Sequence, residues 1–349
     1  MKRHQIMKTA LIAAGLFAGL ATNAQELPAT NRLTFSARFG LNISAKFSGV
    51  SPIAVPTATR TTPDGATYNY DDGYVLPDVS GSGDGNTWNW GYDNSASQVN
   101  SGNNTILLSR SSGLATLRAP AMDDEPSLGC ELAYTHELGV KGKFRYGVEG
   151  ALNYLNIGMS AHNPYSLRAP RITDAFAYFT GTTPPGATTG SAYQGTFDGP
   201  GFVIGTTPVS STTSEGVVGT VTGTRSLDAT LWGGRVGPYF EYYFNKDLSI
   251  SLSGGLAVGL LDTSVAWDET ISFTGGGSIN DTGHGGDTDL LCGGYLAGNL
   301  FWRFDDHWSA AASVQYQNLG TYSHAFGSRK AELDLGGTIF FSIGVSYDF

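Results

Sequence analysis

The sequence has little charge, little cysteine and no long hydrophobic run beyond its first two dozen residues. Charged residues make up 14% of the 349 residues, whereas an ordinary soluble domain carries about 25%. Beyond residue 24, no stretch approaches the roughly 18 consecutive apolar residues that indicate a membrane-spanning helix. Two cysteines, Cys130 and Cys292, exclude a disulfide-rich scaffold and leave at most one bridge to consider.

Basic residues are also scarce, with 20 Lys and Arg against 30 Asp and Glu. Three of them lie in residues 1–24, which have a basic start, an apolar run over 9–21 and a small residue, Ala24, before a cleavage point. This is the pattern of a secretory signal peptide, and the run is too short for a membrane anchor. Removing the signal takes the formal net charge from −10 to −13, which argues against nucleic acid as a partner.

What the sequence does contain is a period-two alternation of apolar and small or polar residues. The first apolar row consists of Leu33, Phe35, Ala37, Phe39, Leu41, Ile43, Ala45 and Phe47. The segment 332–349 alternates in the same way, and each segment is predicted to be one strand with an apolar and a polar face. A strand that crosses a bilayer needs about 9–11 residues and alternates like this, whereas soluble strands are usually shorter.

Six further alternating segments lie between these two, at 128–138, 144–154, 232–244, 250–260, 296–304 and 308–316. Three connections are short hairpin turns, at 141–143, 245–247 and 305–307. The connections 48–126, 160–223 and 263–288 are long. The sequence therefore predicts an all-β fold over 25–349. We expect a closed antiparallel transmembrane β-barrel of eight strands, with short periplasmic turns and long extracellular loops.

The end of the chain has a pattern of its own. Ser342, Gly344, Tyr347 and Phe349 resemble the C-terminal assembly signal of bacterial outer-membrane barrels. With its eight alternating segments, the chain resembles the class that includes the OmpA membrane domain and the OmpX- and OmpW-type barrels. This resemblance implies a place in the cell outer membrane, contact with outer-membrane lipid and insertion by the barrel-assembly machinery.

The inward parity of the predicted strands collects charged residues of both signs. They are Arg38, Arg145, Arg235, Arg303, Glu131, Glu137, Glu149 and Glu241. Because buried charges persist only when paired, we predict a lumen plugged by Arg–Glu pairs. The alternative is a water-filled, porin-like channel for small solutes, which needs ten or twelve strands because eight leave too narrow an interior. Residues 172–179 and 215–226 have some strand character. We interpret 215–226 as an extension of the predicted strand 232–244, on the side away from the periplasmic turns.

The long loops carry two groups of candidate binding residues. Tyr68, Tyr70, Trp88, Trp90 and Tyr92 lie among polar residues and suit an extracellular surface for a sugar or a protein. The alternative is that these rings pack on one another and cap the barrel. The second group consists of Asp281, His284, Asp287 and Asp289, whose closely spaced oxygen ligands could bind calcium. Because no full calcium-loop pattern is present, a solvated loop is favoured, and we expect no metal or cofactor.

The sequence gives little indication of catalysis. The one His-x-Ser sequence, His307-Trp308-Ser309, is similar to the pair used by lipid A deacylases, but it falls on a predicted periplasmic turn. The two cysteines fall on outward rows of well-separated strands, so we expect free thiols. We therefore expect no enzyme, but a structural or surface-interacting, adhesion-like outer-membrane protein.

Overall fold

A computed structural model describes residues 31–56, 59–62, 65, 67–78, 85–123, 126–195 and 199–349. The signal peptide expected in residues 1–24 lies outside this part of the chain. The strands described all pair in antiparallel fashion, and the one helix among these residues is α2 (Ser95–Gln98). None of the described residues forms a helix long and apolar enough to cross a membrane.

Eight strands form a closed, hydrogen-bonded ring. They are β1 (Asn31–Leu41), β11 (Ser127–Lys141), β12 (Phe144–Ala161), β16 (Ser210–Tyr243), β17 (Leu248–Phe273), β18 (Ser278–Arg303), β19 (Trp308–Asn318) and β22 (Thr338–Asp348). Each strand pairs with the next one in this order, including β12 with β16. The last strand, β22, pairs with β1 and so closes the ring, with Leu33 opposite Tyr347. The predicted count of eight is confirmed, and the alternative of ten or twelve strands does not hold for this ring.

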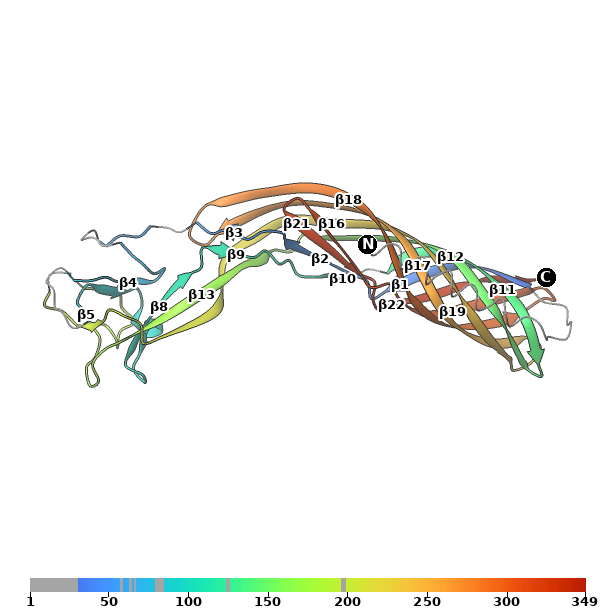
Figure 1. The fold of residues 1–349 in the computed structure, drawn as a ribbon, viewed down its shortest axis with the longest axis horizontal. Helices are drawn as coiled ribbons and strands as arrows, with labels where there is room; N and C mark the ends of the chain where they lie inside the picture. The colour runs from blue at the N-terminus through green and yellow to red at the C-terminus, as the bar shows by residue number, and fades with distance from the viewer. Residues whose placement is uncertain are drawn as a thin grey trace, which may run out of the picture.

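Three strands of the ring are much longer than a bilayer crossing. β16 has 34 residues, and β17 and β18 have 26 each, so they leave the ring as a long curved ribbon (Figure 1). The expected loop 263–288 is therefore wrong, because only 274–277 lie outside strands. The expected loop 160–223 likewise contains β13 (Tyr165–Ala177) and part of β16, whose upward extension is confirmed.

A second correction concerns the segments 33–47 and 332–349, which were each predicted to be one strand. Each of them forms two strands in the structure. β1 ends at Leu41, Asn42 adopts a left-handed φ of 62°, and β2 (Ser44–Gly49) follows. The left-handed backbone at Asn42 interrupts the extended strand, so the row of alternate residues that faces outward on β1 faces the core on β2. Phe39 and Leu41 are exposed on the outside of the ring, whereas Ile43, Ala45 and Phe47 are buried.

The same happens before the last strand, where β21 (Arg329–Asp334) is separated from β22 by a turn. Leu333 and Leu335 are buried, whereas Ile339 and Phe341 are exposed on the ring. Together with β10 (Met122–Asp123) and β20 (Thr321–Phe326), β2 and β21 form a second sheet in the order β10-β2-β21-β20.

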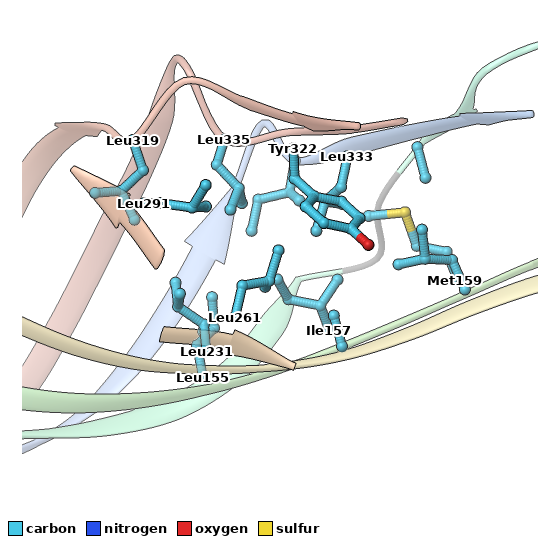
Figure 2. Close-up of a cluster of buried hydrophobic side chains, with 14 of the residues drawn as sticks. Leu155, Ile157, Met159, Leu231, Leu261, Leu291, Leu319, Tyr322, Leu333 and Leu335 are labelled. Carbon is cyan, nitrogen blue, oxygen red and sulfur yellow. The ribbon is translucent and has the colours of Figure 1, made fainter. Parts of the chain in front are cut away.

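The main hydrophobic core lies between this second sheet and the ribbon. Leu155, Ile157, Leu231 and Leu261 come from β12, β16 and β17, and they meet Tyr322, Leu333 and Leu335 from the facing side (Figure 2). One side of this core consists of inner residues of the strands that build the ring, so the core covers the interior of the ring at one end.

The far end of the ribbon carries an outer lobe, opposite the C-terminus (Figure 1). Its short strands are β3 (Ile53–Ala54), β4 (Gly73–Val75), β5 (Asn86–Thr87), β6 (Trp90–Tyr92), β7 (Val99–Asn100), β8 (Thr105–Ser111), β9 (Leu114–Ala115), β14 (Tyr193–Gln194) and β15 (Ile204–Gly205). β8 pairs with β13 and so joins the lobe to the ribbon. Much of the expected loop 48–126 is thus ordered as short strands packed into this lobe.

Candidate functional site

The outer surface of the ring changes from apolar to polar along one line. Four outward residues lie side by side in register across neighbouring strands: Tyr154, Trp232, Leu260 and Leu290. The next outward row away from the short turns consists of Asn156, Thr230, Asp262 and Thr288, also in register. The apolar surface thus ends at one row of paired residues on β12, β16, β17 and β18.

At the same row of residues, the inward-facing side chains change from charged to apolar. On the side of the short turns the inner row holds charged residues such as Glu149 and Arg235. Beyond the line it holds Leu155, Leu231 and Leu261, which lie in register and are buried in the main core. β12, β16 and β17 are therefore apolar outside and polar inside over one half, and polar outside and mostly apolar inside over the other.

Aromatic side chains mark the other limit of the apolar outer surface, beside the short turns. The ring centroids of Phe144 and Tyr242 lie 5.0 Å apart, and those of Trp308 and Tyr347 lie 4.9 Å apart. From Phe144 to Tyr154 the apolar row covers about 11 residues, the length that a tilted strand needs to cross a bilayer. Phe349 stacks on Tyr347 at 6.1 Å, and its backbone hydrogen-bonds to Asn31.

The other two residues of the expected assembly signal lie in the pairing of β22. Ser342 lies opposite both Arg38 and Ser313, and Gly344 lies opposite Ser36 and Ala311. A side chain on Gly344 would collide with the backbone carbonyl oxygen of Phe35 at about 2.1 Å. A glycine is therefore required where β1 and β22 approach each other.

Four of the predicted lumen residues form one buried cluster. Arg38 donates to Glu131 at 2.6 Å, and Arg235 donates to Glu131 at 2.8 Å and to Glu149 as well. The guanidinium of Arg38 also lies over the ring of Phe340, 3.5 Å from its centroid. Glu131 thus lies between both arginines.

A second cluster lies nearer the short turns. Arg32 donates to Asp348 at 2.7 Å and to Glu241 at 3.2 Å, and Arg303 reaches Asp348 at 3.1 Å. Arg145 pairs with Glu137. Sequence reasoning missed Arg32 and Asp348, although both have the inward parity of their strands; Arg303 meets an aspartate rather than a glutamate.

A third cluster lies beyond the apolar core, and its carboxylates Glu269 and Asp281 were missed because 263–288 was assigned to a loop. Arg329 donates to Glu269 at 2.7 Å and to Asp281 at 2.9 Å, and Arg225 lies 3.6 Å from Glu269. Burial raises the pKa of Glu269, while the two arginines lower it. These contacts tie β16, β17, β18 and β21 together above the ring.

The candidate calcium ligands lie in this region, on β18 rather than in a loop. Asp281 accepts from Arg329, and Asp287 lies 2.9 Å from His324 and 3.1 Å from the hydroxyl of Tyr322. His284 has the opposite parity and is exposed, so it faces away from Asp287. Among the described residues, no group of three or more His, Cys, Asp or Glu side chains is placed to hold a metal ion.

The predicted aromatic binding surface is divided between the inside and the outside of the outer lobe. Trp90 and Tyr92 are buried in a core with Ile106, Leu108 and Phe176, so for these two rings the packing alternative holds. Trp88 is half-buried and lies against Gly199, where an added Cβ would meet its ring at 2.2 Å. Tyr68 and Tyr70 are half-buried and line a groove of about 500 Å³.

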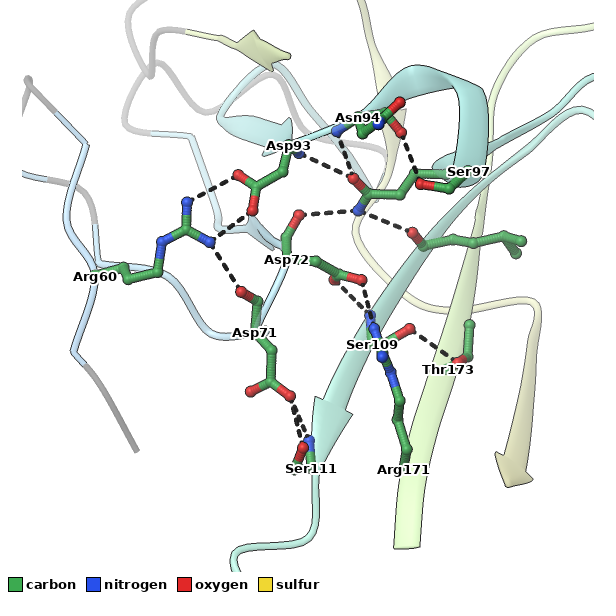
Figure 3. A network of polar contacts seen from close by, with 12 residues as sticks. Arg60, Asp71, Asp72, Asp93, Asn94, Ser97, Ser109, Ser111, Arg171 and Thr173 are labelled. Atoms are coloured by element: carbon green, nitrogen blue, oxygen red, sulfur yellow. Dashed lines mark hydrogen bonds and ion pairs between the residues drawn. The ribbon is translucent and has the colours of Figure 1, made fainter. Parts of the chain in front are cut away.

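A polar network holds one wall of this groove (Figure 3). Arg60 donates to Asp93 at 2.6 and 2.9 Å, and Arg171 donates to Asp72 at 3.1 Å. Asp72 also accepts from the backbone of Ser109 at 2.7 Å, and burial raises the pKa of this carboxyl group. Arginines and tyrosines facing a groove offer donors to an extracellular ligand, with the aspartates holding the arginines in place.

Comparison with known proteins found similarities to solved structures alone. No protein-family model matches it, and no curated protein matches it. Ail, the attachment invasion locus protein of Yersinia pestis, was solved with the heparin analogue sucrose octasulfate. It is 9% identical, with 93% of this chain and 100% of Ail covered and a TM-score of 0.28. The outer membrane protease OmpT of Escherichia coli is 8% identical, with 94% and 99% covered and a TM-score of 0.34.

The outer membrane protein OprG of Pseudomonas aeruginosa is 11% identical, with 92% of this chain and 95% of OprG covered and a TM-score of 0.32. At such identities and scores, these matches assign neither an activity nor a ligand. The solved structures that the chain matches over most of its length are outer-membrane β-barrel proteins, the class that its sequence resembles.

Proposed function

We propose that the chain is an outer-membrane β-barrel with a closed lumen and a structural or surface-interacting, adhesion-like role. The observation that carries this proposal is the line at Tyr154, Trp232, Leu260 and Leu290, where the outside turns polar and the inside turns apolar. An apolar outside with a charged inside suits a strand that faces lipid, and the reverse suits a strand that faces water. The ring then spans the bilayer, and the ribbon and outer lobe project from it.

The closed lumen is supported by what fills it. The cavity beside Glu131, Glu149 and Arg235 has a volume of about 20 Å³, and the one beside Arg32 has about 10 Å³. Such volumes hold about one water molecule each. Beyond the charged clusters, the main hydrophobic core covers the same interior, so a continuous water path for small solutes is not favoured.

The partners follow from this arrangement. Outer-membrane lipid covers the apolar belt, and the barrel-assembly machinery inserts the chain. An extracellular ligand meets the outer lobe, whose groove at Tyr68 and Tyr70 faces solvent. We expect no enzymatic activity, because His307-Trp308-Ser309 lies at the short-turn end, and Trp308 packs on Tyr347.

Tryptophan quenching tests the membrane placement. Purified protein is reconstituted in liposomes with lipids brominated on their acyl chains, which quench only tryptophans in contact with lipid. We expect Trp232→Phe to remove part of the quenched signal and Trp90→Phe, in the buried lobe core, to leave the quenched part unchanged. Equal quenching of both positions would contradict the proposal.

Single-channel recording in a planar bilayer tests the closed lumen separately. We expect no steady conductance from the wild-type protein. Steady conductance would favour the small-solute channel and remove the plugged lumen, while leaving the membrane placement intact.

A further inference from the structure

Two of the arginines that the structure describes differ from the others in their contacts. Twelve arginines lie in the described residues, and ten of them make ion pairs with Asp or Glu. Only Arg118 and Arg168 among them make no ion pair with an Asp or Glu side chain that the structure describes. Both are exposed, and both line the same groove of about 300 Å³. In a chain with a formal net charge of −10, two neighbouring arginines that make no such ion pair are unusual.

The strand geometry brings the two side chains to one face. Thr116 lies opposite Arg168 in an antiparallel bridge, and the backbone N–H of Thr116 donates to the carbonyl oxygen of Arg168 at 3.2 Å. Arg118 is two residues beyond Thr116 and therefore diagonal to Arg168. Diagonal neighbours on one face have Cα atoms about 7–8 Å apart, within reach of long side chains. Leu117 and Leu167 point to the opposite, buried face.

The remaining lining fits an oxygen-rich ligand. The hydroxyl groups of Thr116 and Ser166 lie on the same exposed face, and Pro120 and Pro170 add apolar contacts. Glu215 is the one acidic residue of the lining. Two like charges side by side destabilise a sheet surface, and an oxyanion between them would relieve that repulsion. The planar donors of arginine match phosphate, sulfate and carboxylate.

We propose that this groove binds an oxyanion group carried on a saccharide. The hydroxyl-bearing lining and Glu215, which accepts hydrogen bonds from sugar hydroxyls, favour a saccharide over a dense acidic peptide. Arg168 lies opposite Val217 on β16, about 50 Å along the strand from Trp232 at 3.3 Å per residue. Its position outside the membrane rests on the proposed function. At that height the saccharide belongs either to the outer leaflet's own lipopolysaccharide or to a glycan from outside.

The test measures binding to the full-length protein in detergent by fluorescence anisotropy. The probes are a labelled dextran sulfate octasaccharide, the neutral dextran octasaccharide and an octaglutamate peptide. We expect the sulfated probe alone to bind well, and R118Q/R168Q to weaken it by about tenfold or more, since each lost charge-assisted hydrogen bond is worth about that factor. R118K/R168K should fall between the two, because lysine keeps the charge and lacks the planar fork.

K141Q/K143Q is the matched control, since it removes the same charge at a short turn far from the groove. Its affinity should equal that of the wild-type protein, and all variants should show the same heat-modifiable band. Equal loss in the control, no effect of R118Q/R168Q, no binding of any sulfated or phosphorylated saccharide, or equally tight binding of octaglutamate would overturn the proposal.

Purified lipopolysaccharide separates the two sources of the saccharide. Competition that depends on Arg118 and Arg168 supports the groove and assigns it to the membrane's own lipid. Binding of the sulfated probe that lipopolysaccharide does not displace supports the groove and assigns it to an external glycan. Because the assay needs no membrane, failure here is distinguishable from failure of the membrane placement, which the brominated lipids test.

Discussion

The side-chain amide of Asn42 donates a hydrogen bond of 2.8 Å to the carbonyl oxygen of Gly337. Asn42 ends β1 with a φ of 62°, and Gly337 belongs to the turn before β22. The bond therefore joins the two places where the neighbouring strands β1 and β22 leave the ring. Beyond it, β2 and β21 pair with each other and carry their apolar residues into the main core.

Replacement of Asn42 by valine should destabilise this junction. A β-branched residue at positive φ costs roughly 1–2 kcal/mol, and the hydrogen bond to Gly337 is also lost. Asn42→Gly is the control, because glycine accepts this φ and loses only the hydrogen bond. Urea unfolding of the reconstituted protein measures the free energy of unfolding. Equal stability of the two variants would show that the backbone conformation is not strained by a side chain.

Replacement of Glu131 by glutamine should destabilise the ring itself. Glu131 is buried and accepts from both Arg38 and Arg235, so the loss leaves two buried cations short of a partner. We expect a cost of about 3–5 kcal/mol in the free energy of unfolding. Glu332→Gln removes an exposed partner of Lys330 and should cost about 0–1 kcal/mol. If both variants unfold at the same urea concentration, the charges are not a structural network.

Loss of the terminal aromatic ring should impair insertion. Phe349 stacks on Tyr347, and its backbone exchanges hydrogen bonds with Asn31. We expect Phe349→Asp to reduce the heat-modifiable, membrane-inserted protein in cells. Phe304→Asp changes an aromatic side chain that is equally exposed, at 58%, beside another short turn. Wild-type amounts of inserted Phe349→Asp protein, or equal defects in both variants, would contradict a specific assembly signal.

The two cysteines should be free thiols on opposite sides of the ring. Both are unpaired in the structure, Cys130 on β11 and Cys292 on β18, and three strands of the ring separate these two. Reconstituted protein should react at Cys292 with a maleimide that partitions into lipid, and much less with a charged maleimide. Mass spectrometry that found a bridge between the two would contradict the strand order.

The outer lobe should respond to pH through Asp72. Burial raises its pKa above the ordinary 3.8, so the folded lobe holds this proton to a higher pH than the unfolded chain does. Stability from this group is therefore present at low pH and declines as pH rises through the folded pKa. Thermal unfolding followed by tryptophan fluorescence should show the wild-type protein losing stability relative to Asp72→Asn as the pH rises above about 4. A constant difference across this range would mean that the carboxyl group is unperturbed.

The ring was predictable because its signal is local. Along β12 or β17 the outward apolar row can be read residue by residue, and three short turns fix which strands are neighbours. The ribbon was not predictable in the same way. Beyond Trp232 and Leu260 the apolar residues move to the inner face, so a search for one continued outward row reports a loop.

The candidate sites were predictable to a different degree. Inward parity found Arg38, Glu131 and Arg235, because lipid-facing and interior positions strictly alternate. It could not say which arginine meets which carboxylate, since that depends on strand stagger. Trp90 and the exposed Arg118 have no local signal at all, because their burial and missing partners depend on strands far away in the sequence.

The pairing of β1 with β22 has a consequence for how the protein is made. This seam closes the ring, and everything that builds the ribbon and the outer lobe lies between these two strands in the sequence. If the ring spans the outer membrane, the closed and charge-filled interior leaves no passage for a folded lobe. We therefore expect the lobe to be translocated as an extended chain while the seam is still open. Its tryptophan-containing core would then form only on the outer side, as a late event in biogenesis.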